Sequence, residues 1–145
     1  MAEQKALYVD ANWVTTANTI VNTNPSDTND VIGEYAQASS EHVNNALTAA
    51  NRAVGDWGVS PMETRYQVLM AIGNELIERS GELGELLARE EGKTGAEGVG
   101  EVYRSGQFFH YFAAEVHRQI DDRADSVLPG VEIETRREPV GVVAI

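Results

Sequence analysis

The sequence contains no cysteine, and this absence excludes three kinds of chemistry. A disulfide, a cysteine metal ligand or a cysteine nucleophile cannot come from this chain. The absence fits a reducing compartment, so we expect a cytoplasmic protein. The sequence also lacks an apolar run near the length of a membrane span, and its first twenty residues hold no apolar signal-peptide core. These absences predict a protein without a membrane partner.

Lysine is scarce as well, because Lys5 and Lys93 are the only two and arginines supply the other basic residues. The 11 basic residues face 23 acidic ones, which leaves a net charge of −12. A surface this acidic repels phosphate backbones, so nucleic acid is not an expected partner. The same balance suits a salt-rich cytoplasm, although an acidic surface that keeps the chain in solution is the simpler explanation.

The 145 residues, of which 42% are hydrophobic, suffice for one domain with a buried core. The first part of the chain alternates short β-branched or aromatic runs with turn-forming residues. Strands are predicted at residues 8–9, 13–14, 19–21 and 31–36, with a dense turn cluster at residues 24–30. This order predicts a small antiparallel β unit.

Helical patterns follow these strands. Ser39 or Ser40 can cap the first helix, and Gly55 and Gly58 end it. Its apolar face is predicted to consist of Val43, Ala46, Leu47, Ala50, Ala53, Val54 and Trp57.

The next helix has a sharper start. Ser60 is predicted as its cap, with Pro61 at the first helical position and Glu63 at the third. A break or a kink is expected at residues 80–81, and the helix that continues stops before Gly92.

Thr94 and Glu97 have the spacing of another capping box and open the last predicted helix. Its inward residues are predicted to be Val102, Phe109, Phe112, Ala113 and Val116. A polar connection at residues 121–129 leads to residues 131–136, whose alternation predicts a strand with one charged face.

Residues 140–145 form a continuous apolar run, which is typical of a strand buried on both faces of a parallel sheet. The neighbours of such a strand need crossover connections of about a dozen residues or more. The preceding sequence offers no second strand of this kind. We therefore expect the chain to be a fragment of a larger α/β protein.

Two glycine-containing segments have nucleotide-binding alternatives. Residues 92–94, Gly-Lys-Thr, resemble the end of a phosphate-binding loop, but Leu87 takes the place of its first glycine and a helix precedes. A helix end followed by a cap is the better interpretation. Gly95, Gly98 and Gly100 lack the dinucleotide-binding spacing, so close helix packing is expected there.

Other chemistry-bearing residues are scattered. His110 and His117 lie seven positions apart without a third ligand, so we expect no metal there, and His42 is remote from both. Asp121, Asp122 and Asp125 are expected in a solvated loop, and the aromatic residues 108–112 in packing contacts. The chain offers no nucleophile with a matching base.

The order of these elements resembles the aldehyde dehydrogenase superfamily over nearly the whole chain. Residues 8–14 resemble its opening Tyr-Ile-Asp-Gly-Xaa-Trp strand pair, and residues 24–33 its Asn-Pro-Xaa-Thr-Gly-Glu-Val-Ile-Gly segment. Residues 90–102 resemble its Gly-Lys element with the following helix. Residues 136–145, Arg-Arg-Glu-Pro-Val-Gly-Val-Val-Ala-Ile, resemble the approach to its first Rossmann strand and form the most specific match.

One departure concerns a turn. Ala11 stands where the family has a glycine, so Asn12 is expected to take the left-handed conformation. The wording of residues 24–27 and 90–94 is similar to dehydrogenases that act on semialdehydes, such as 2-oxoglutarate semialdehyde.

The resemblance implies the amino-terminal part of an α/β aldehyde dehydrogenase fold. Small β hairpins, a mainly helical segment, an oligomerisation strand and the first Rossmann strand would follow one another. Residues 1–130 would belong to the cofactor-binding domain and residues 131–139 would start the oligomerisation hairpin. Residues 140–145 would form the first strand of a truncated Rossmann sheet.

By the same resemblance, the full-length enzyme would use NAD or NADP to oxidise an aldehyde to a carboxylic acid. A cysteine thiolate would attack the aldehyde, and a glutamate would activate the hydrolytic water. Both would lie beyond Ile145, so this chain receives no catalytic or cofactor-binding residue. We expect the chain alone to be inactive and to bind no cofactor tightly.

The resemblance also bears on partners and on a metal. A homo-oligomer, dimer or tetramer, is expected to form through residues 131–137. Glu90 matches a carboxylate that, in some members, binds a monovalent cation with backbone carbonyls near Asn22. An ordinary helix-end glutamate is the alternative. For the whole chain, the alternative is a non-catalytic helical module that packs on a dehydrogenase partner.

Overall fold

The structure is a computed structural model that describes residues 4–118 and 121–145. The strands are β1 (Gln4–Lys5), β2 (Leu7–Val9), β3 (Asn12–Val14), β4 (Thr19–Thr23), β5 (Val31–Ala36), β6 (Asp122–Asp125) and β7 (Glu132–Thr135). The helices are α1 (Ser40–Gly58), α2 (Met62–Glu78), α3 (Ser80–Glu91) and α4 (Gly95–Val116). None of the described helices is both long and apolar enough to cross a membrane.

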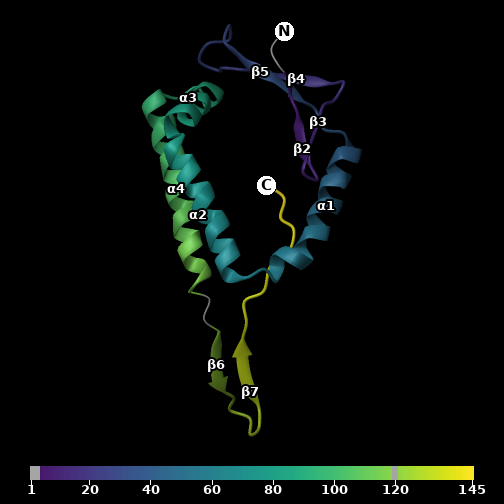
Figure 1. Cartoon of the computed structure of the whole chain (residues 1–145), viewed down its shortest axis with the longest axis vertical. Coiled ribbons are helices and arrows are strands. Elements are labelled where there is room, and N and C mark those ends of the chain that lie inside the picture. The colour runs from purple at the N-terminus through teal and green to yellow at the C-terminus, as the bar shows by residue number, and fades with distance from the viewer. Residues whose placement is uncertain (1–3, 119–120) are drawn as a thin grey trace.

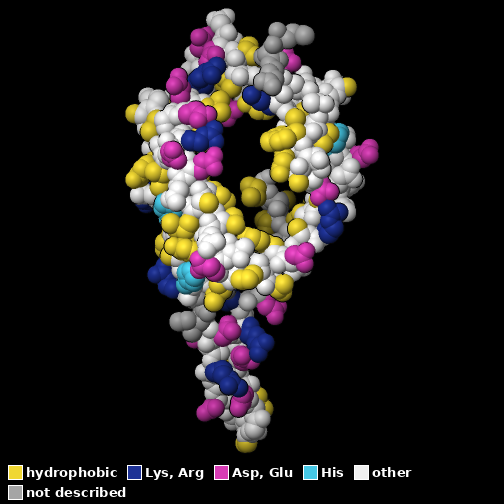
Figure 2. Space-filling model, in the orientation of Figure 1, with side chains coloured by type: hydrophobic (Ala, Val, Ile, Leu, Met, Phe, Trp, Pro, Cys, Tyr) yellow, Lys and Arg dark blue, Asp and Glu magenta, His cyan; other side chains and the backbone are white. Residues whose placement is uncertain are grey.

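The elements surround an open centre. The first five strands lie at one end, with α1 on one flank and α2, α3 and α4 together on the other, while β6 and β7 project at the opposite end (Figure 1). Figure 2 shows that the centre stays open when all side chains are drawn and that hydrophobic side chains gather around its rim. The arrangement therefore leaves apolar surface uncovered toward the middle of the molecule.

The β unit confirms the predicted short strands, but its sheet is mixed and not purely antiparallel as predicted. β5 lies between β1, which is parallel to it, and β4, which is antiparallel, and β2 pairs with β3 as a separate hairpin. The expectation for Asn12 is wrong. Asp10 and Ala11 have φ angles of 51° and 61°, because a two-residue hairpin loop needs positive φ at both central positions. Asn12 stays in β3 and its side chain donates to the carbonyl oxygen of Asp10 at 2.7 Å.

Helix α1 begins as predicted but is not packed. Ser39 caps it, and the backbone N–H of Ser39 donates to the ring of His42 in return. The predicted apolar face exists, yet Val43, Leu47 and Trp57 are 51%, 43% and 48% exposed. No residue of α1 is buried. The amphipathic pattern thus predicted the helix correctly, while its partner surface is missing from the described residues.

The predicted cap of the second helix is wrong in its residue. The hydroxyl of Ser60 donates to the carbonyl oxygen of Trp57 at 2.7 Å, so Ser60 closes α1. Pro61 takes the cap position of α2 without a side-chain hydrogen bond. The expected break is confirmed, since α2 ends at Glu78 and α3 starts at Ser80.

The helices α2, α3 and α4 form the packed part of the molecule. Gly98 of α4 lies against the backbone of Gly84 of α3, and Gly106 of α4 lies against the backbone of Gly73 of α2. A side chain at these positions would overlap the facing helix. Ala113, which is fully buried, continues this contact. Small residues therefore let the three helix backbones approach closely.

The inward face of α4 is confirmed only in part. Val102, Ala113 and Val116 are buried as predicted, whereas Phe112 is 58% exposed. The buried residues follow the line of contact with α2 and α3, and Phe112 lies beside that line. The pattern alone did not show where this stripe ends.

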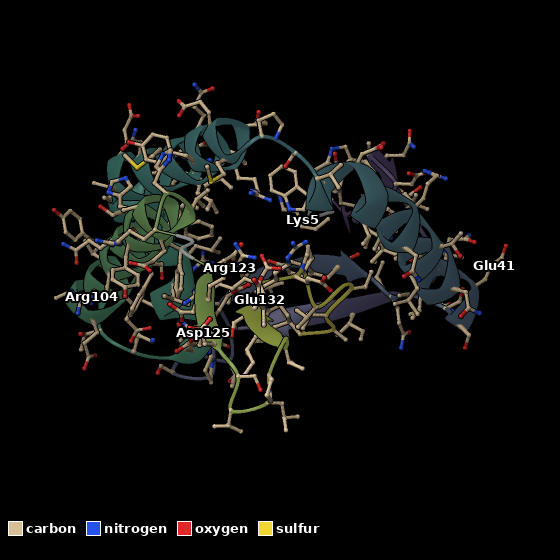
Figure 3. The ribbon with its side chains drawn as sticks, turned by 90° about the horizontal axis from the view of Figure 1, so that it is seen from below. Lys5, Glu41, Arg104, Arg123, Asp125 and Glu132 are labelled. Atoms are coloured by element: carbon tan, nitrogen blue, oxygen red, sulfur yellow. The ribbon has the colours of Figure 1, made fainter. Side chains whose placement is uncertain are left out.

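The hairpin of β6 and β7 begins earlier than predicted. Residues 122–125 were expected in a polar connection, but they pair antiparallel with β7, from Asp122 with Thr135 to Asp125 with Glu132. An all-polar strand carries no apolar alternation, so its pairing could not be seen. Arg123 forms an ion pair with Glu132 across the strands (Figure 3).

Residues 140–145 form no strand in this structure. The predicted strand requires neighbours on both edges, and the described residues place none beside it. The Rossmann sheet to which this segment was assigned stays a prediction.

Candidate functional site

The structure brings together the two residues singled out for a cation. The amide nitrogen of Asn22, on β4, donates to Oε1 of Glu90 at the end of α3, at 2.8 Å. Tyr35, on β5, donates its hydroxyl to the same oxygen at 3.1 Å. Tyr35 was not predicted as part of this cluster. The strand register could have found it, because Asn22 lies opposite Gly33 and Tyr35 follows on the same face of the sheet.

The two donors to Glu90 among the described residues, Asn22 and Tyr35, are neutral side chains. The negative charge of Glu90 therefore acts on the pKa of Tyr35. Burial raises the pKa of Tyr35, and the hydrogen bond to Glu90 raises it further. The amide nitrogen of Asn22 is used for Glu90, so a cation ligand from Asn22 would have to be one of its carbonyl oxygens. Within the described residues, the cluster of Asn22, Tyr35 and Glu90 acts as an anchor between the β unit and α3.

An ion pair one position earlier reinforces this anchor. Arg89 donates through Nε and Nη2 to both carboxylate oxygens of Asp30, at 2.8 and 2.6 Å. Asn24 adds a hydrogen bond to Asp30 at 3.2 Å. The hydrogen bond from Arg89, followed by that from Asn24, lowers the pKa of Asp30 from 3.8 to about 2. Such a two-pronged contact fixes the orientation of the loop as well as its position.

The loop after β4 closes over the end of α3. Gly92 has a left-handed φ of 72°, and its carbonyl oxygen accepts a hydrogen bond from Ser26 at 2.9 Å. A side chain at Gly92 would press on Ser26 and on Pro25. An open cavity of about 420 Å³ lies beside this contact, between the loop, α3 and the start of α4.

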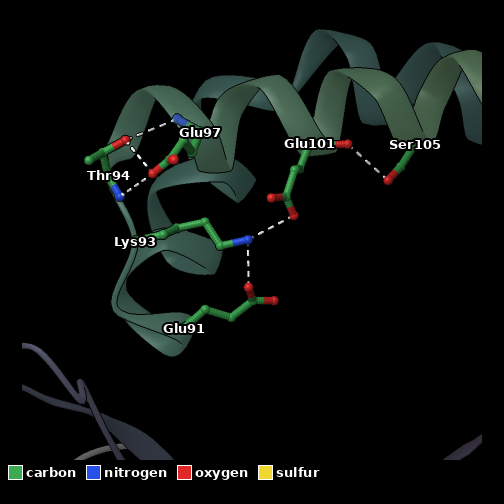
Figure 4. Close-up of polar contacts among 6 residues, drawn as sticks. All are labelled: Glu91, Lys93, Thr94, Glu97, Glu101 and Ser105. Carbon is green, nitrogen blue, oxygen red and sulfur yellow. Dashed lines mark hydrogen bonds and ion pairs between the residues drawn. The ribbon is translucent and has the colours of Figure 1, made fainter.

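Lys93 borders this cavity but does not project a free charge into it. Its ammonium group contacts Glu91 at 2.5 Å and Glu101 at 2.7 Å, and both contacts raise its pKa (Figure 4). Thr94 and Glu97 form the predicted capping box next to it. The interpretation of residues 92–94 as a helix end followed by a cap is confirmed, and Lys93 is held in ion pairs.

The glycines of α4 do not form a nucleotide cradle in this arrangement. Gly98 is used for packing against Gly84, while Gly95 and Gly100 face open space. His110 of α4 and His117, the residue after that helix, have separate partners, since His110 bonds to Asn74 and the ring of His117 contacts that of Tyr66. Among the described residues, no group of three or more acidic or histidine side chains could hold a metal ion. The polar contacts therefore serve attachment of one element to another.

A comparison with models of known protein families shows to which family the chain belongs. The sequence model of the aldehyde dehydrogenase family matches residues 13–145. This chain belongs to the aldehyde dehydrogenase family. Its α/β arrangement of small sheets followed by four helices is the amino-terminal part of the fold of that family.

Relatives of this aldehyde dehydrogenase chain act on semialdehydes according to their names. It is 34% identical to the α-ketoglutarate semialdehyde dehydrogenase of Haloferax volcanii, over 100% of this chain and 30% of that protein. It is 31% identical to the α-ketoglutaric semialdehyde dehydrogenase of Bacillus subtilis, over 95% of this chain and 29% of that protein. The chain thus spans less than a third of the length of these relatives.

Solved structures agree. A betaine aldehyde dehydrogenase from Staphylococcus aureus in complex with NAD+ superposes with a TM-score of 0.85 at 30% identity, over 94% of this chain and 28% of that chain. An aldehyde dehydrogenase from Brucella melitensis biovar abortus superposes with a TM-score of 0.83 at 26% identity, over 90% of this chain and 27% of that chain.

Proposed function

We propose that this chain forms the amino-terminal part of an enzyme that oxidises a semialdehyde to a carboxylic acid with NAD or NADP. The observation that carries the proposal is the family match over residues 13–145, together with relatives named as semialdehyde dehydrogenases. The cofactor choice between NAD and NADP stays open in the proposal.

The role of this chain in that enzyme is structural. The uncovered faces of α1 and the rim of the open centre offer apolar surface for the missing part of the cofactor-binding domain. When bound, the nicotinamide cofactor would accept the hydride that the aldehyde loses. The described residues hold none of the groups for that step, so we propose that the chain alone is inactive.

The hairpin of β6 and β7 is proposed as the oligomer contact. It projects from the rest of the chain, and Val127 at its turn is fully exposed (Figure 1). A projecting hairpin has a free strand edge on each side, and such an edge can pair with a second subunit. We propose a homo-oligomer and a cytoplasmic location as part of this function.

A monovalent cation at Glu90 remains a further proposal. Glu90 accepts from two neutral donors, Asn22 and Tyr35, and no basic side chain among the described residues balances its charge. Titration of the chain with sodium, followed by the line width of the 23Na NMR signal against a Glu90→Gln control, tests it. No saturable change in the unsubstituted chain would refute the cation site.

The enzyme function is tested with a hybrid protein. Residues 1–145 are joined to the part of the Haloferax volcanii enzyme that lies beyond its matched segment. The hybrid is expected to reduce NAD or NADP with a semialdehyde, while the purified 145-residue chain is expected to do neither. An inactive, folded hybrid would contradict the proposal, and so would turnover by the chain alone.

The same experiment addresses the alternative of a separate interaction module. The chain and the remaining part of the Haloferax volcanii enzyme are mixed without being joined. Activity in the mixture but not in the hybrid would favour the module. Activity in the hybrid favours the enzyme part.

A further inference from the structure

One arginine of α4 lies over an aromatic ring instead of against a carboxylate. Arg104, on α4, donates to the amide oxygen of Gln107 at 3.0 Å and lies over the ring of Phe108, 5.4 Å from its centre. Within the described ranges, it forms no ion pair. Acidic partners are instead found for Arg52, Arg79, Arg89, Lys93, Arg118, Arg123 and Arg136. Arg65 and Arg137 also have no acidic partner among the described residues, so Arg104 is distinguished by its contact with the ring of Phe108.

The surroundings of Arg104 are aromatic and exposed. Phe108, Tyr111 and Phe112 are 55%, 56% and 58% exposed. They follow Arg104 at four, seven and eight positions, which places all four residues on one side of the helix. Figure 3 shows Arg104 on the outer side of the helical layer, away from the open centre. This face of α4 thus combines one free positive charge with a wall of rings.

The chemistry of this face suits a short aliphatic carboxylate. A guanidinium that stacks on a ring keeps its N–H edge available for a carboxylate, and a planar fork matches the two oxygens. The rings offer contact to methylene groups. The relatives reported above are named for the semialdehyde of α-ketoglutarate, a dicarboxylic acid, and such a molecule carries a carboxylate at the end opposite the aldehyde.

We propose that Arg104 binds the carboxylate of the semialdehyde substrate and that Phe108 and Phe112 contact its methylene chain. Arg104 would then select for substrates with a terminal carboxylate, while the aldehyde end reaches the reacting groups in the remaining part of the enzyme. This inference rests on the proposed function for the reaction, but the binding of a carboxylate can be measured without it.

The first test uses the chain alone and glutarate as the probe. The side-chain N–H signals of 15N-labelled arginines are followed by NMR during titration, with Arg104→Gln to assign the signal. The Arg104 signal is expected to shift and saturate at a glutarate concentration roughly tenfold below that for Arg137, which is exposed and has no stacked ring. Equal responses of Arg104 and Arg137 would overturn the proposal.

The second test measures selectivity in the hybrid enzyme. Arg104→Gln is expected to raise the KM for succinate semialdehyde roughly tenfold and to leave the KM for butanal, which lacks the carboxylate, unchanged. Arg104→Lys should retain part of the preference, and Arg118→Gln, just beyond the end of α4, should retain all of it. A loss of stability or assembly with unchanged selectivity would identify this face as a subunit or domain contact and overturn the proposal. An inactive hybrid would argue against the enzyme function, and the glutarate titration would still decide the role of Arg104.

Discussion

The layer of α2, α3 and α4 and the single helix α1 have similar amphipathic sequences but opposite surroundings. In the layer, glycines such as Gly84 and Gly98 bring backbones into contact, and Val102 and Ala113 are buried. Helix α1 is well capped at Ser39 and has no buried residue. The difference shows that the sequence features that form a helix are not the same as those that pack it. Capping and spacing form the helix, whereas its packing needs a facing surface.

The largest effect is expected where two backbones touch. Gly98→Ala would place a methyl group against the carbonyl oxygen of Gly84 and should lower the free energy of unfolding by about 3 kcal/mol. Gly100→Ala is the control, because this glycine faces open space and alanine favours the helix by about 1 kcal/mol. Urea unfolding followed by circular dichroism measures both. Similar stabilities of the two variants would contradict the close contact of α3 and α4.

The next prediction compares the two regions directly. Val102→Ala removes buried methyl groups from the layer and should cost about 2 kcal/mol. Leu47→Ala acts on the open face of α1 and should stay within about 0.5 kcal/mol in the chain alone. In the hybrid enzyme, where α1 is expected to be covered, Leu47→Ala should become costly. If Leu47→Ala destabilises the chain alone as much as Val102→Ala, α1 is not open.

The helix caps give a smaller contrast. Thr94→Ala removes the cap of α4 and should lower global stability by about 1 kcal/mol. Ser39→Ala removes the cap of α1, and its effect should remain local because α1 can fray while the layer persists. Amide hydrogen exchange separates the two. Faster exchange throughout the chain after Ser39→Ala would show that α1 and the layer unfold together.

The smallest effect concerns pH. Asp30 has its pKa lowered from 3.8 to about 2 by Arg89, so its ion pair stabilises the folded state above pH 3.8, and this contribution is lost as the pH falls toward 2. Because both side chains are partly exposed, the change should be modest. Asp30→Asn should remove this part of the acid dependence of the unfolding midpoint. Asp56→Asn, on α1, should leave it in place, and an unchanged acid profile of Asp30→Asn would contradict the assignment.

The parts of the fold that could be predicted are those encoded by neighbouring residues. Thr94 with Glu97 signals a helix start through positions three apart, and Gly92 signals a helix end through its own backbone freedom. Ser60 has an equally good local signal, but its hydroxyl closes the preceding helix. The Ser60 side chain could either close α1 or cap α2, and the sequence does not show which of the two hydrogen bonds is formed.

Contacts between segments that are distant in the sequence were harder to predict. β6 was missed because Asp122 and its neighbours acquire their strand only by pairing with β7. The meeting of Asn22 and Glu90 was expected through the family resemblance, since no spacing rule links two residues that far apart. Arg104 carried no signal in the sequence, because the absence of a nearby acid becomes visible only when the folded neighbours are known.

The anchor at Glu90 also has a consequence for the order of events during folding. Asn22 and Glu90 are separated by 68 positions, and Ser26 and Gly92 by 66. A growing chain produces the whole β unit long before the end of α3 exists to receive it. Closing so long a loop is slow compared with forming a hairpin or a helix. The first segment to be synthesised is therefore expected to be among the last to be fixed in place.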